Sequence, residues 1–230
     1  MKTILVTGVA SGIGYYIAQQ YIEQNYHVIA IDINSILLDN CTKYICDLRN
    51  EEEVCNVFNQ IQHIDLAINC AGVSATRQEF IHFSASEITQ QWQMNFLPTF
   101  NAMKYEIKLM QPAKSGKIVN IASITAKIGM KNFLAYSSAK ASIVNLTKVA
   151  AIENHQYNIL INSISPATID TPMIRRKYNG KLKDYSDIYY THDCGNVHDI
   201  FSIVKMFEEN NFMTGNDIVV DGGLTNLFII

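Results

Sequence analysis

The stretch TILVTGVASGIG, residues 3–14, decides the fold. Its first four residues form an apolar, β-branched run that predicts a buried strand. Three glycines follow, Gly8, Gly12 and Gly14, and helical periodicity begins at the last of them. Glycine lets the backbone turn tightly and approach a pyrophosphate, whose negative charge is stabilised by the free N–H groups and dipole at a helix start. The stretch predicts a strand, a phosphate-binding turn and a helix, although an ordinary tight turn would use the same glycines.

The second apolar run ends on an acidic residue. Asp32 closes the run from His27, and it follows the glycines by about twenty residues, where a carboxylate accepts hydrogen bonds from the ribose diol of an adenosine. The same charge would repel a 2′-phosphate, and neither Ser11 nor Ile33 supplies a cation to offset that repulsion. We therefore expect NAD rather than NADP as the cofactor. The alternative role for Asp32 is that of an ordinary hydrogen-bond acceptor at the end of a strand.

Strand-like and helix-like segments alternate along the rest of the chain. Short apolar runs predict strands at 3–6, 27–32, 43–46, 66–69, 117–121, 160–165 and 217–220, and helical periodicity predicts helices at 13–25, 51–62, 86–108, 133–154 and 196–209. This alternation predicts an α/β Rossmann fold, in which a doubly wound, mostly parallel seven-stranded sheet has helices on both faces. Only about ten residues separate Asp32 from the next strand, so a full crossover helix is not expected there.

The domain organisation is simple. No Pro-rich or Ser-rich linker and no repeat divides the sequence, which favours one domain over residues 1–230. The polar segment 172–194 has weak periodicity and predicts a mobile surface element between a strand and a helix. The apolar tail at 227–230 is too short to span a bilayer, so we expect it to pack on the core or on another subunit.

The composition excludes several functional classes. Hydrophobic residues make up 48% of the chain, too much for a disordered protein, and the net charge of −3 gives no basic footprint for nucleic acid or a membrane. The five cysteines lack the spacing of a metal site, so we expect reduced thiols in a cytoplasmic protein. The six histidines show no metal-ligand spacing either, and no metal is expected.

A tyrosine and a lysine lie one helical turn apart in YSSAK, residues 136–140. A spacing of four places Tyr136 and Lys140 on one face, where the ammonium could stabilise a phenolate and lower the tyrosine pKa. Such a pair is usually an ordinary helix surface. Ser123, however, follows the strand at 117–121, at the carboxyl end where open parallel sheets bind ligands, and its hydroxyl can donate to a substrate oxygen. Together the three residues favour an acid/base site.

These motifs resemble the short-chain dehydrogenase/reductase family over essentially the whole chain. The glycine turn at 7–14 matches the family, as does the serine-to-tyrosine spacing; the family's NNAG reads NCAG at 69–72, and its PGxxxT reads PATIDT at 166–171. The catalytic residues implied by the resemblance are Ser123, Tyr136, Lys140 and Asn95. The cofactor-binding residues implied are Gly8, Ser11, Gly12, Ile13, Gly14, Asp32, Ile33, Asp47, Leu48, Asn69, Ala71, Gly72, Tyr136, Lys140, Pro166, Ile169 and Thr171.

The departures from the family pattern are few. Cys70 replaces the second asparagine of NNAG, and Ala167 replaces the glycine after Pro166, but neither change removes a catalytic group. The short connection after Asp32 and the short segment 172–194, taken as a substrate lid, resemble compact family members that act on small hydroxy acids and cyclic diols. Among these are the 3-hydroxybutyrate and 2,3-dihydro-2,3-dihydroxybenzoate dehydrogenases.

The expected function is an NAD-dependent oxidoreductase that interconverts a secondary alcohol and a ketone on a small substrate, with Tyr136 as the acid and base. Arg175 and Arg176 are candidates for binding a substrate carboxylate, although a solvated basic turn is the simpler interpretation. A 3-oxoacyl-carrier-protein reductase and a non-catalytic dinucleotide sensor stay open as alternatives. The family's subunit pairing implies a homotetramer or homodimer, formed through the helices at 86–108 and 133–154.

Overall fold

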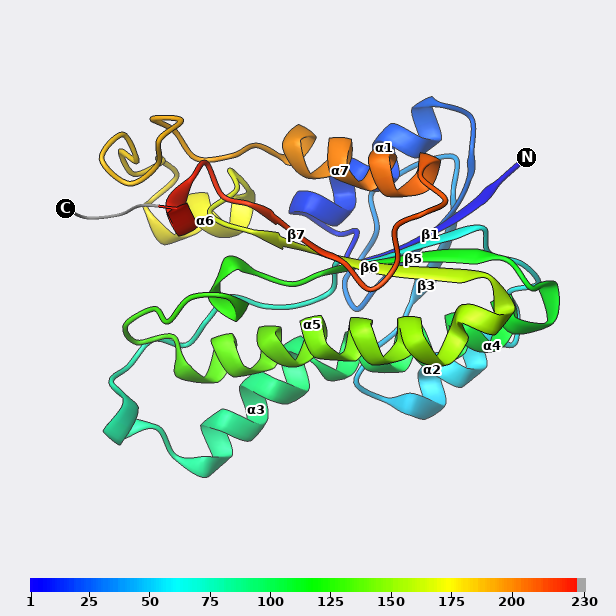
Figure 1. The fold of residues 1–230 in the computed structure, drawn as a ribbon, viewed down its shortest axis with the longest axis horizontal. Helices are drawn as coiled ribbons and strands as arrows, with labels where there is room; N and C mark the ends of the chain where they lie inside the picture. Colours follow the sequence, from blue (N-terminus) through cyan, green and yellow to red (C-terminus); the bar gives the residue numbers. More distant parts are fainter. Residues whose placement is uncertain (227–230) are drawn as a thin grey trace.

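The computed structural model describes residues 1–226, which are built around a seven-stranded sheet (Figure 1). The strands are β1 (Thr3–Thr7), β2 (His27–Asp32), β3 (Thr42–Ile45), β4 (Leu66–Asn69), β5 (Gly116–Ile121), β6 (Ile159–Pro166) and β7 (Asp217–Val220). They follow the order β3-β2-β1-β4-β5-β6-β7, and every neighbouring pair is parallel. The predicted α/β fold with a doubly wound, seven-stranded sheet is confirmed.

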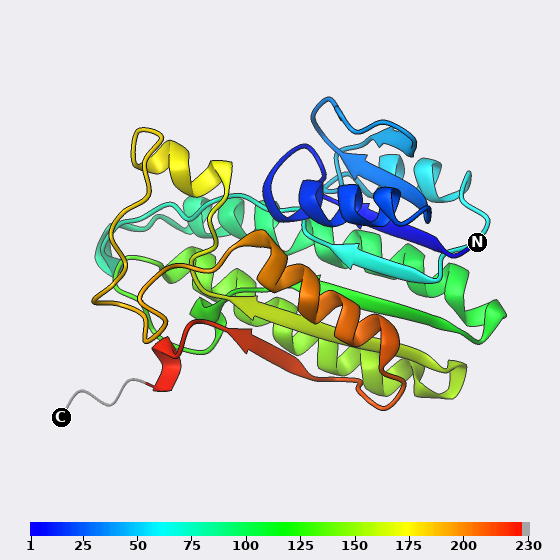
Figure 2. The same ribbon diagram turned by 90° about the horizontal axis from the view of Figure 1, so that it is seen from above.

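Helices cover both faces of the sheet (Figures 1 and 2). They are α1 (Gly12–Glu23), α2 (Glu51–Phe58), α3 (Ala85–Asn95), α4 (Leu97–Ala113), α5 (Leu134–Asn154), α6 (Pro172–Lys177) and α7 (Val197–Glu209). Successive residues of a strand point to opposite faces. Ile4 and Val6 of β1 therefore pack with Tyr21 of α1, whereas Leu5 between them packs with Phe58 of α2. Because both faces are buried at the centre of the sheet, β1, β2 and β4 are largely apolar runs in the sequence.

The connection between β2 and β3 contains no helix, as its length predicts. Residues 33–41 have no regular secondary structure, yet β3 pairs in parallel with β2, with Ile29 opposite Thr42. Ile36 and Leu38 of this connection are buried in the core cluster that contains Tyr21 of α1. Two apolar side chains therefore cover the sheet where a crossover helix would otherwise lie.

The single helix predicted at 86–108 is wrong. The chain forms α3 and α4 instead, with a break at Phe96. Pro98 explains the break, because proline has no N–H to donate to the carbonyl oxygen of Met94. The first turn of a helix tolerates proline, so a new helix begins at Leu97. The break leaves Asn95 as the last residue of α3.

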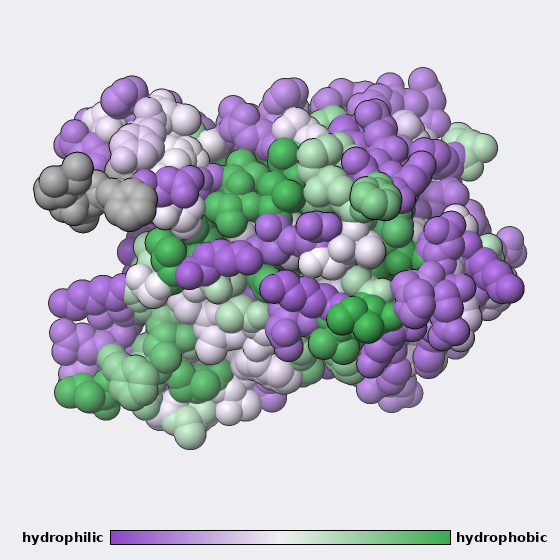
Figure 3. Space-filling view, viewed as in Figure 1, coloured by the Kyte–Doolittle hydropathy of each residue, from purple (hydrophilic) through white to green (hydrophobic). Residues whose placement is uncertain are grey.

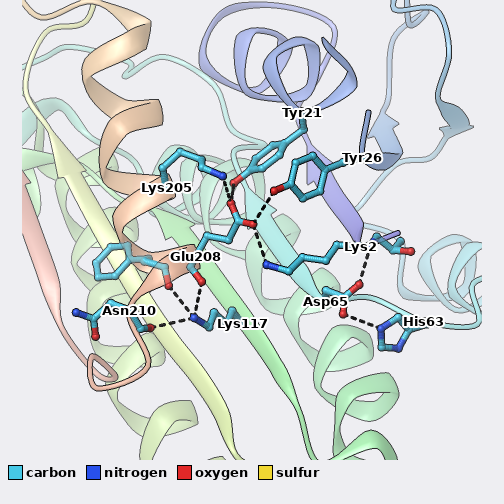
Figure 4. A network of polar contacts seen from close by, with 11 residues as sticks. Lys2, Tyr21, Tyr26, His63, Asp65, Lys117, Lys205, Glu208 and Asn210 are labelled. Atoms are coloured by element: carbon cyan, nitrogen blue, oxygen red, sulfur yellow. Dashed lines mark hydrogen bonds and ion pairs between the residues drawn. The ribbon is translucent and has the colours of Figure 1, made fainter. Parts of the chain in front are cut away.

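A buried carboxylate joins elements at the amino ends of the strands (Figure 4). The Glu208 side chain, in the last turn of α7, is 4% exposed and pairs with Lys2 at 3.1 Å and Lys205 at 2.5 Å. The hydroxyls of Tyr21 and Tyr26 donate to the same carboxylate, at 3.0 and 3.3 Å. Although burial opposes ionisation, the two ammonium groups and the Tyr21 hydrogen bond lower the pKa of Glu208. Glu208 is therefore ionised at neutral pH and links the start of β1 to α1 and α7.

Lys117 extends this arrangement to β5. Its Nζ donates to the backbone carbonyl oxygens of Phe207, Glu208 and Asn210, at 3.2, 2.6 and 2.9 Å (Figure 4). The last carbonyl groups of a helix have no partner within the helix, and the dipole there is negative, so a cation stabilises this end. The amino end of β5 is thereby fixed to the carboxyl end of α7.

Residues 172–194 run over the carboxyl end of the sheet (Figure 2). After α6 the segment has no further helix or strand. Tyr185 and Tyr189 are buried with their ring centres 5.7 Å apart, and the Tyr189 hydroxyl accepts a hydrogen bond from the backbone N–H of Thr168. These two tyrosines hold the segment against the sheet. The tail at 227–230, expected to pack on the core or a subunit, lies outside the described residues.

Candidate active site

A cavity of about 390 Å³ lies at the carboxyl ends of the strands. Open α/β sheets bind ligands at this edge. The predicted residues that line it are Gly8, Ser11, Gly12, Ile13, Gly14, Asp32, Ile33, Asp47, Leu48, Ala71, Gly72, Asn95, Ser123, Tyr136, Lys140, Pro166, Ile169 and Thr171. Asn69, Arg175 and Arg176 are not among the lining residues.

The turn between β1 and α1 admits only glycine at three positions. Gly8 has a φ of +73°, and a Cβ there would lie 2.8 Å from the backbone nitrogen of Ala71. Gly12 has a φ of +66°, and a Cβ on Gly14 would collide with the carbonyl oxygen of Gly8. The turn therefore presents bare backbone to the cavity at the start of α1, where N–H groups and the helix dipole stabilise an anion. This surface fits the pyrophosphate of a dinucleotide.

Asp32 is held rigidly where β2 ends. One carboxylate oxygen accepts from the backbone N–H of Ala10 at 2.9 Å, and the other accepts from the backbone and side-chain N–H groups of Asn34 at 2.8 and 3.1 Å. The residue is 8% exposed and lines the cavity. A carboxylate oxygen has two lone pairs, so Asn34 occupies both on Oδ1, whereas Ala10 leaves one free on Oδ2. The fixed carboxylate can therefore also accept a hydrogen bond from a ribose hydroxyl.

A second acidic residue at this part of the cavity is neutralised. The Asp47 carboxylate accepts two hydrogen bonds from the Nε of Arg49, at 2.8 and 3.1 Å, and one from its terminal nitrogen at 2.6 Å. Hydrogen bonds from Arg49, opposed by partial burial, lower the pKa of Asp47. Arg49 also lines the cavity but was not predicted. Its only signal in the sequence is a cation two residues after Asp47.

Ser123 is arranged to donate a hydrogen bond. Its Oγ accepts from the backbone N–H of Thr125 at 3.3 Å and from the Thr125 hydroxyl at 3.2 Å. A serine hydroxyl has two acceptor positions and one proton. With both acceptor positions used, the Ser123 proton is directed to another oxygen, such as that of Tyr136 or a substrate. Sequence reasoning missed Thr125, whose signal is a hydroxyl two residues beyond Ser123.

Tyr136 and Lys140 share one face of α5, as their spacing predicts, but they are not in close contact. The Lys140 Nζ lies 5.8 Å from the centre of the Tyr136 ring and donates at 2.9 Å to the carbonyl oxygen of Ile121. Burial raises the pKa of Tyr136 to about 12, with a hydrogen bond from Ser123 acting in the opposite direction, and burial lowers the pKa of Lys140 to about 8. The expectation of a lowered tyrosine pKa is wrong here, because desolvation outweighs an ammonium held on a backbone carbonyl.

Asn95 fixes the backbone that follows β4. The side chain is fully buried; its Oδ1 accepts from the backbone N–H of Val73 at 3.0 Å, and its Nδ2 donates to the carbonyl oxygen of Gln91 at 3.1 Å. A Cβ on the neighbouring Gly72 would lie 3.0 Å from this Oδ1 and 3.6 Å from the Lys140 Nζ. Asn95 and Gly72 together keep the segment after β4 close to Lys140.

Asn69 points away from the cavity. Because side chains alternate along a strand, it lies on the same face of β4 as Ala67, which packs in the core cluster of α2 and α4. Its Nδ2 donates at 3.0 Å to the Oδ1 of Asn120 and at 3.0 Å to the Oε2 of Glu106. The Asn69 side chain is therefore engaged by Asn120 and Glu106 and does not line the cavity.

Glu106 is an acid that the sequence analysis did not identify. It is fully buried on α4, and no cation within residues 1–226 pairs with it. Its Oε1 has no hydrogen-bond partner among those residues. Burial raises the pKa of Glu106 to about 8, although the hydrogen bond from Asn69 opposes this shift. Glu106 is therefore a mostly neutral carboxyl group at pH 7.

The two arginines proposed for substrate binding have other partners. Arg175 donates to both carboxylate oxygens of Asp170, at 2.7 and 2.5 Å, and the Nε of Arg176 donates to the carbonyl oxygen of Pro172 at 3.2 Å. The α6 residues that line the cavity are Met173 and Ile174. The structure therefore does not bring Arg175 or Arg176 to the cavity wall.

Residues 1–226 hold neither a metal-binding cluster nor a membrane-spanning helix. No group of three or more His, Cys, Asp or Glu side chains within that range is arranged to hold a metal ion. None of the helices described there is long and apolar enough to cross a membrane.

Comparison with known proteins identifies the family. The family described as short chain dehydrogenase matches residues 2–181. Dehydrogenase/reductase SDR family member 6 of Xenopus laevis is 28% identical, with 96% of this chain and 96% of that protein covered. The 2,5-dichloro-2,5-cyclohexadiene-1,4-diol dehydrogenase of Sphingobium indicum is also 28% identical, with 97% of each protein covered.

Solved structures show the same similarity with different dinucleotides bound. The 4-hydroxyisoleucine dehydrogenase complexed with NADH is 30% identical, with a TM-score of 0.87 over 99% of this chain and 100% of that one. ElxO with NADP bound is 28% identical, with a TM-score of 0.90 over 98% of this chain and 99% of that one. The chain thus belongs to the short-chain dehydrogenase family, as an oxidoreductase that acts on CH–OH groups with NAD(P).

Proposed function

We propose that the protein is an NAD-dependent dehydrogenase that interconverts a secondary alcohol and a ketone on a small substrate. One observation carries the proposal: Ser123, Tyr136 and Lys140 line the same cavity as the glycine turn and Asp32. The cavity thus contains an acid/base group, a hydrogen-bond donor and a backbone surface that suits a dinucleotide. The catalytic roles of these residues are part of the proposal.

The proposed mechanism assigns each group an action on the substrate alcohol. The Ser123 hydroxyl donates a hydrogen bond to the substrate oxygen, and the deprotonated Oη of Tyr136 takes the hydroxyl proton. A bound nicotinamide dinucleotide supplies the acceptor for the hydride that leaves the same carbon, so the alcohol loses two electrons and becomes a ketone. Lys140 stabilises the phenolate electrostatically, and Asn95 keeps the backbone after β4 beside it.

The preference for NAD is proposed from the charges near Asp32. The carboxylate is fixed in the cavity by Ala10 and Asn34. Arg49, which also lines the cavity, is engaged by Asp47. A 2′-phosphate would therefore meet a negative charge without a free cation beside it. The glycine turn and Asp32 would hold the pyrophosphate and the ribose, respectively.

We expect kcat/KM for NAD to exceed kcat/KM for NADP. The Asp32→Asn substitution removes a unit charge beside the 2′ position, so it should lower the ratio of kcat/KM for NAD to kcat/KM for NADP by about 10-fold or more. The amide keeps an acceptor for Ala10, so the turn should remain folded. Asp39→Asn is a matched control, since the Asp39 side chain is 92% exposed. Steady-state kinetics with both cofactors makes the comparison; a wild-type preference for NADP would refute the role given to Asp32.

A small hydroxy acid or cyclic diol is the proposed substrate class. The short connection after β2 supports it, as do the relatives whose names refer to a cyclohexadiene diol and to 4-hydroxyisoleucine. The test is a turnover screen with NAD and a panel of hydroxy acids, cyclic diols, sugars and steroids, followed by the absorbance of NADH. We expect turnover of a hydroxy acid or a diol.

Two results of this screen would contradict the proposal. Turnover confined to a 3-oxoacyl thioester with NADPH would indicate a 3-oxoacyl-carrier-protein reductase. Tight NAD binding without turnover of any panel member would indicate a dinucleotide sensor. Intact Ser123, Tyr136, Lys140 and Asn95 favour a catalyst over a sensor.

We also propose that the protein is a cytoplasmic homotetramer or homodimer. The rings of Trp92, Phe96 and Phe100 stack in series at 4.2 and 6.1 Å, and Trp92 and Phe100 are 36% and 37% exposed. Val149 and Ile152 on α5 are exposed as well. Figure 3 shows further hydrophobic side chains gathered near α7 and β7. Exposed apolar faces of this kind favour contact between subunits.

A further inference from the structure

We propose that Lys127 is a positioning residue for the reaction, because its ion pair with Asp217 holds the turn that directs the Ser123 hydroxyl toward the substrate. The inference rests on the proposed function, since it adds a residue to the same site. Lys127 directly follows the 3₁₀ turn Ile124–Ala126, and Asp217 begins β7, which lies beside β6 at the edge of the sheet (Figure 2). The ion pair therefore joins two segments that are far apart in the sequence.

The 3₁₀ turn sets the orientation of the Ser123 side chain. The Ser123 Oγ accepts hydrogen bonds from the backbone N–H and the hydroxyl of Thr125, which lies within the turn. The carbonyl oxygen of Ser123 accepts from the backbone N–H of Ala126 at 2.9 Å. The carbonyl oxygen of Ile124 accepts from the backbone N–H of Lys127 at 2.8 Å. The backbone of Lys127 is thus hydrogen-bonded into the turn, and a displacement of Lys127 would carry Thr125 with it.

The Lys127 side chain fixes the far end of this turn to the sheet. Its Nζ lies 2.9 Å from the Oδ2 of Asp217, whose side chain is only 2% exposed. The Ser163 hydroxyl donates to the Oδ1 of Asp217 at 2.5 Å, and the Ser165 hydroxyl lies 3.0 and 2.8 Å from the two carboxylate oxygens. Both serines belong to β6. The carboxylate is therefore held rigidly, and the ammonium that pairs with it has a fixed place beside β6.

The near end of the turn is fixed to the same strand. The backbone N–H of Ala122 donates to the carbonyl oxygen of Ile164 in β6 at 2.7 Å. Beyond Lys127, residues 128–133 form no helix or strand before α5 begins, and a Cβ on Gly129 would have no atom within 4 Å. The ion pair thus holds the turn at the point where the chain leaves regular structure.

An ion pair that only stabilises the edge strand is the simpler alternative. A buried carboxylate needs a partner cation, and Lys127 is the cation that pairs with Asp217 among residues 1–226. Because this cation comes from the turn that orients Ser123, the stability of β7 and the orientation of Ser123 depend on one contact. Loss of the ion pair lowers stability under both interpretations, so catalysis has to be measured separately from folding.

The first test compares two lysine-to-methionine variants. Lys127→Met and Lys205→Met each remove a cation from a buried carboxylate, and Lys205 pairs with Glu208 at the amino ends of the strands, away from the cavity. Both variants should have a lower melting temperature. We expect kcat to fall about 10-fold in Lys127→Met, because a small displacement of a positioned group has an effect of this size, and to stay unchanged in Lys205→Met. Lys127→Arg keeps a cation for Asp217 and should retain most of the activity. Equal kcat in the two methionine variants would refute the positioning role.

A double-mutant cycle with Ser123→Ala shows whether Lys127 acts through Ser123. The Ser123→Ala variant lacks the hydroxyl that the turn orients, so its kcat is already low. Adding Lys127→Met to it should cause no further loss, because two substitutions that act on one group are not additive. A loss of about 10-fold in both backgrounds would mean that Lys127 acts independently of Ser123, and it would overturn the proposal.

Hydrogen exchange separates this inference from the proposed function. With NAD present, the backbone amides of residues 122–128 should exchange faster in Lys127→Met and Asp217→Asn than in the wild type or in Lys205→Met, because the far end of the turn is released. That result, without turnover of any substrate by the wild type, would refute the dehydrogenase and keep the ion pair as the support of the turn. Turnover by the wild type, with equal exchange in the two methionine variants, would refute the role of the ion pair and keep the dehydrogenase.

Discussion

Tyr136→Phe is expected to lower kcat for alcohol oxidation about 1,000-fold, within the range that a positioned acid/base group contributes. The phenylalanine ring keeps the edge contact with Phe133 and loses only the oxygen that exchanges the proton. NAD binding, measured by titration calorimetry, should be unchanged because the glycine turn and Asp32 carry the proposed contacts to the dinucleotide. A variant with kcat close to that of the wild type would overturn the assignment of Tyr136.

Two further measurements make this result specific. Tyr157→Phe removes a hydroxyl from the 3₁₀ turn His155–Tyr157, at the opposite end of β6 from the cavity, and should retain full activity. The pH profile supplies the second measurement. Oxidation needs the phenolate, and burial raises the pKa of Tyr136 to about 12, so the rate of oxidation should increase with pH. The Tyr136→Phe variant should lose that dependence.

Glu106→Gln is expected to stabilise the protein at neutral pH. The amide retains an oxygen for the hydrogen bond from Asn69 and removes a carboxyl group that has no paired cation in its burial site. In the unfolded chain Glu106 ionises with a pKa near its usual 4.5, whereas burial raises the folded pKa to about 8. The folded state therefore binds more protons than the unfolded state between these two values.

The sign of the pH dependence follows from that difference. The stability that the protonated Glu106 contributes is complete below about pH 4.5 and is lost progressively as the pH rises to about 8. The free energy of unfolding of the wild type should therefore fall by about 2.5 kcal/mol relative to the Glu106→Gln variant between pH 5 and pH 7. Urea denaturation at a series of pH values measures this difference. Parallel curves for the two proteins would contradict a raised pKa.

Glu208→Gln supplies a matched control with the opposite sign. The chemical change is the same, but the Glu208 carboxylate pairs with Lys2 and Lys205, which lower its pKa despite burial. Removing this charge leaves two ammonium groups without their partner. The variant should lose stability at neutral pH, so the two substitutions distinguish a buried acid without a cation from one that is paired.

Most of the fold could be predicted from the sequence because both faces of the sheet are buried. The central strands β1, β2 and β4 are then largely apolar runs, and the predicted limits of β2, β4 and β7 coincide with the observed ones. The error at α3 and α4 has a physical origin. Apolar spacing continues across Phe96, and the effect of Pro98 depends on whether it lies inside a helix or in its first turn.

Part of the cavity could be predicted because its residues follow strands. The ends of parallel strands meet at one edge, so Gly8, Asp32 and Ser123 could be placed together from their positions in the chain. Glu106 could not be predicted, because the spacing of apolar residues in α4 does not show which charged residue faces the sheet.

The contacts of Glu208 and Lys117 lie at the amino ends of the strands (Figure 4), and the cavity lies at the carboxyl ends. The side chains that tether the helices to the sheet are therefore separate from those that meet a substrate. Loops at residues 73–79 and 172–194 can change in length and sequence without disturbing those tethers. This separation favours the evolution of new substrate specificities. The loops that contact the substrate can change while the contacts that hold the helices to the sheet stay the same.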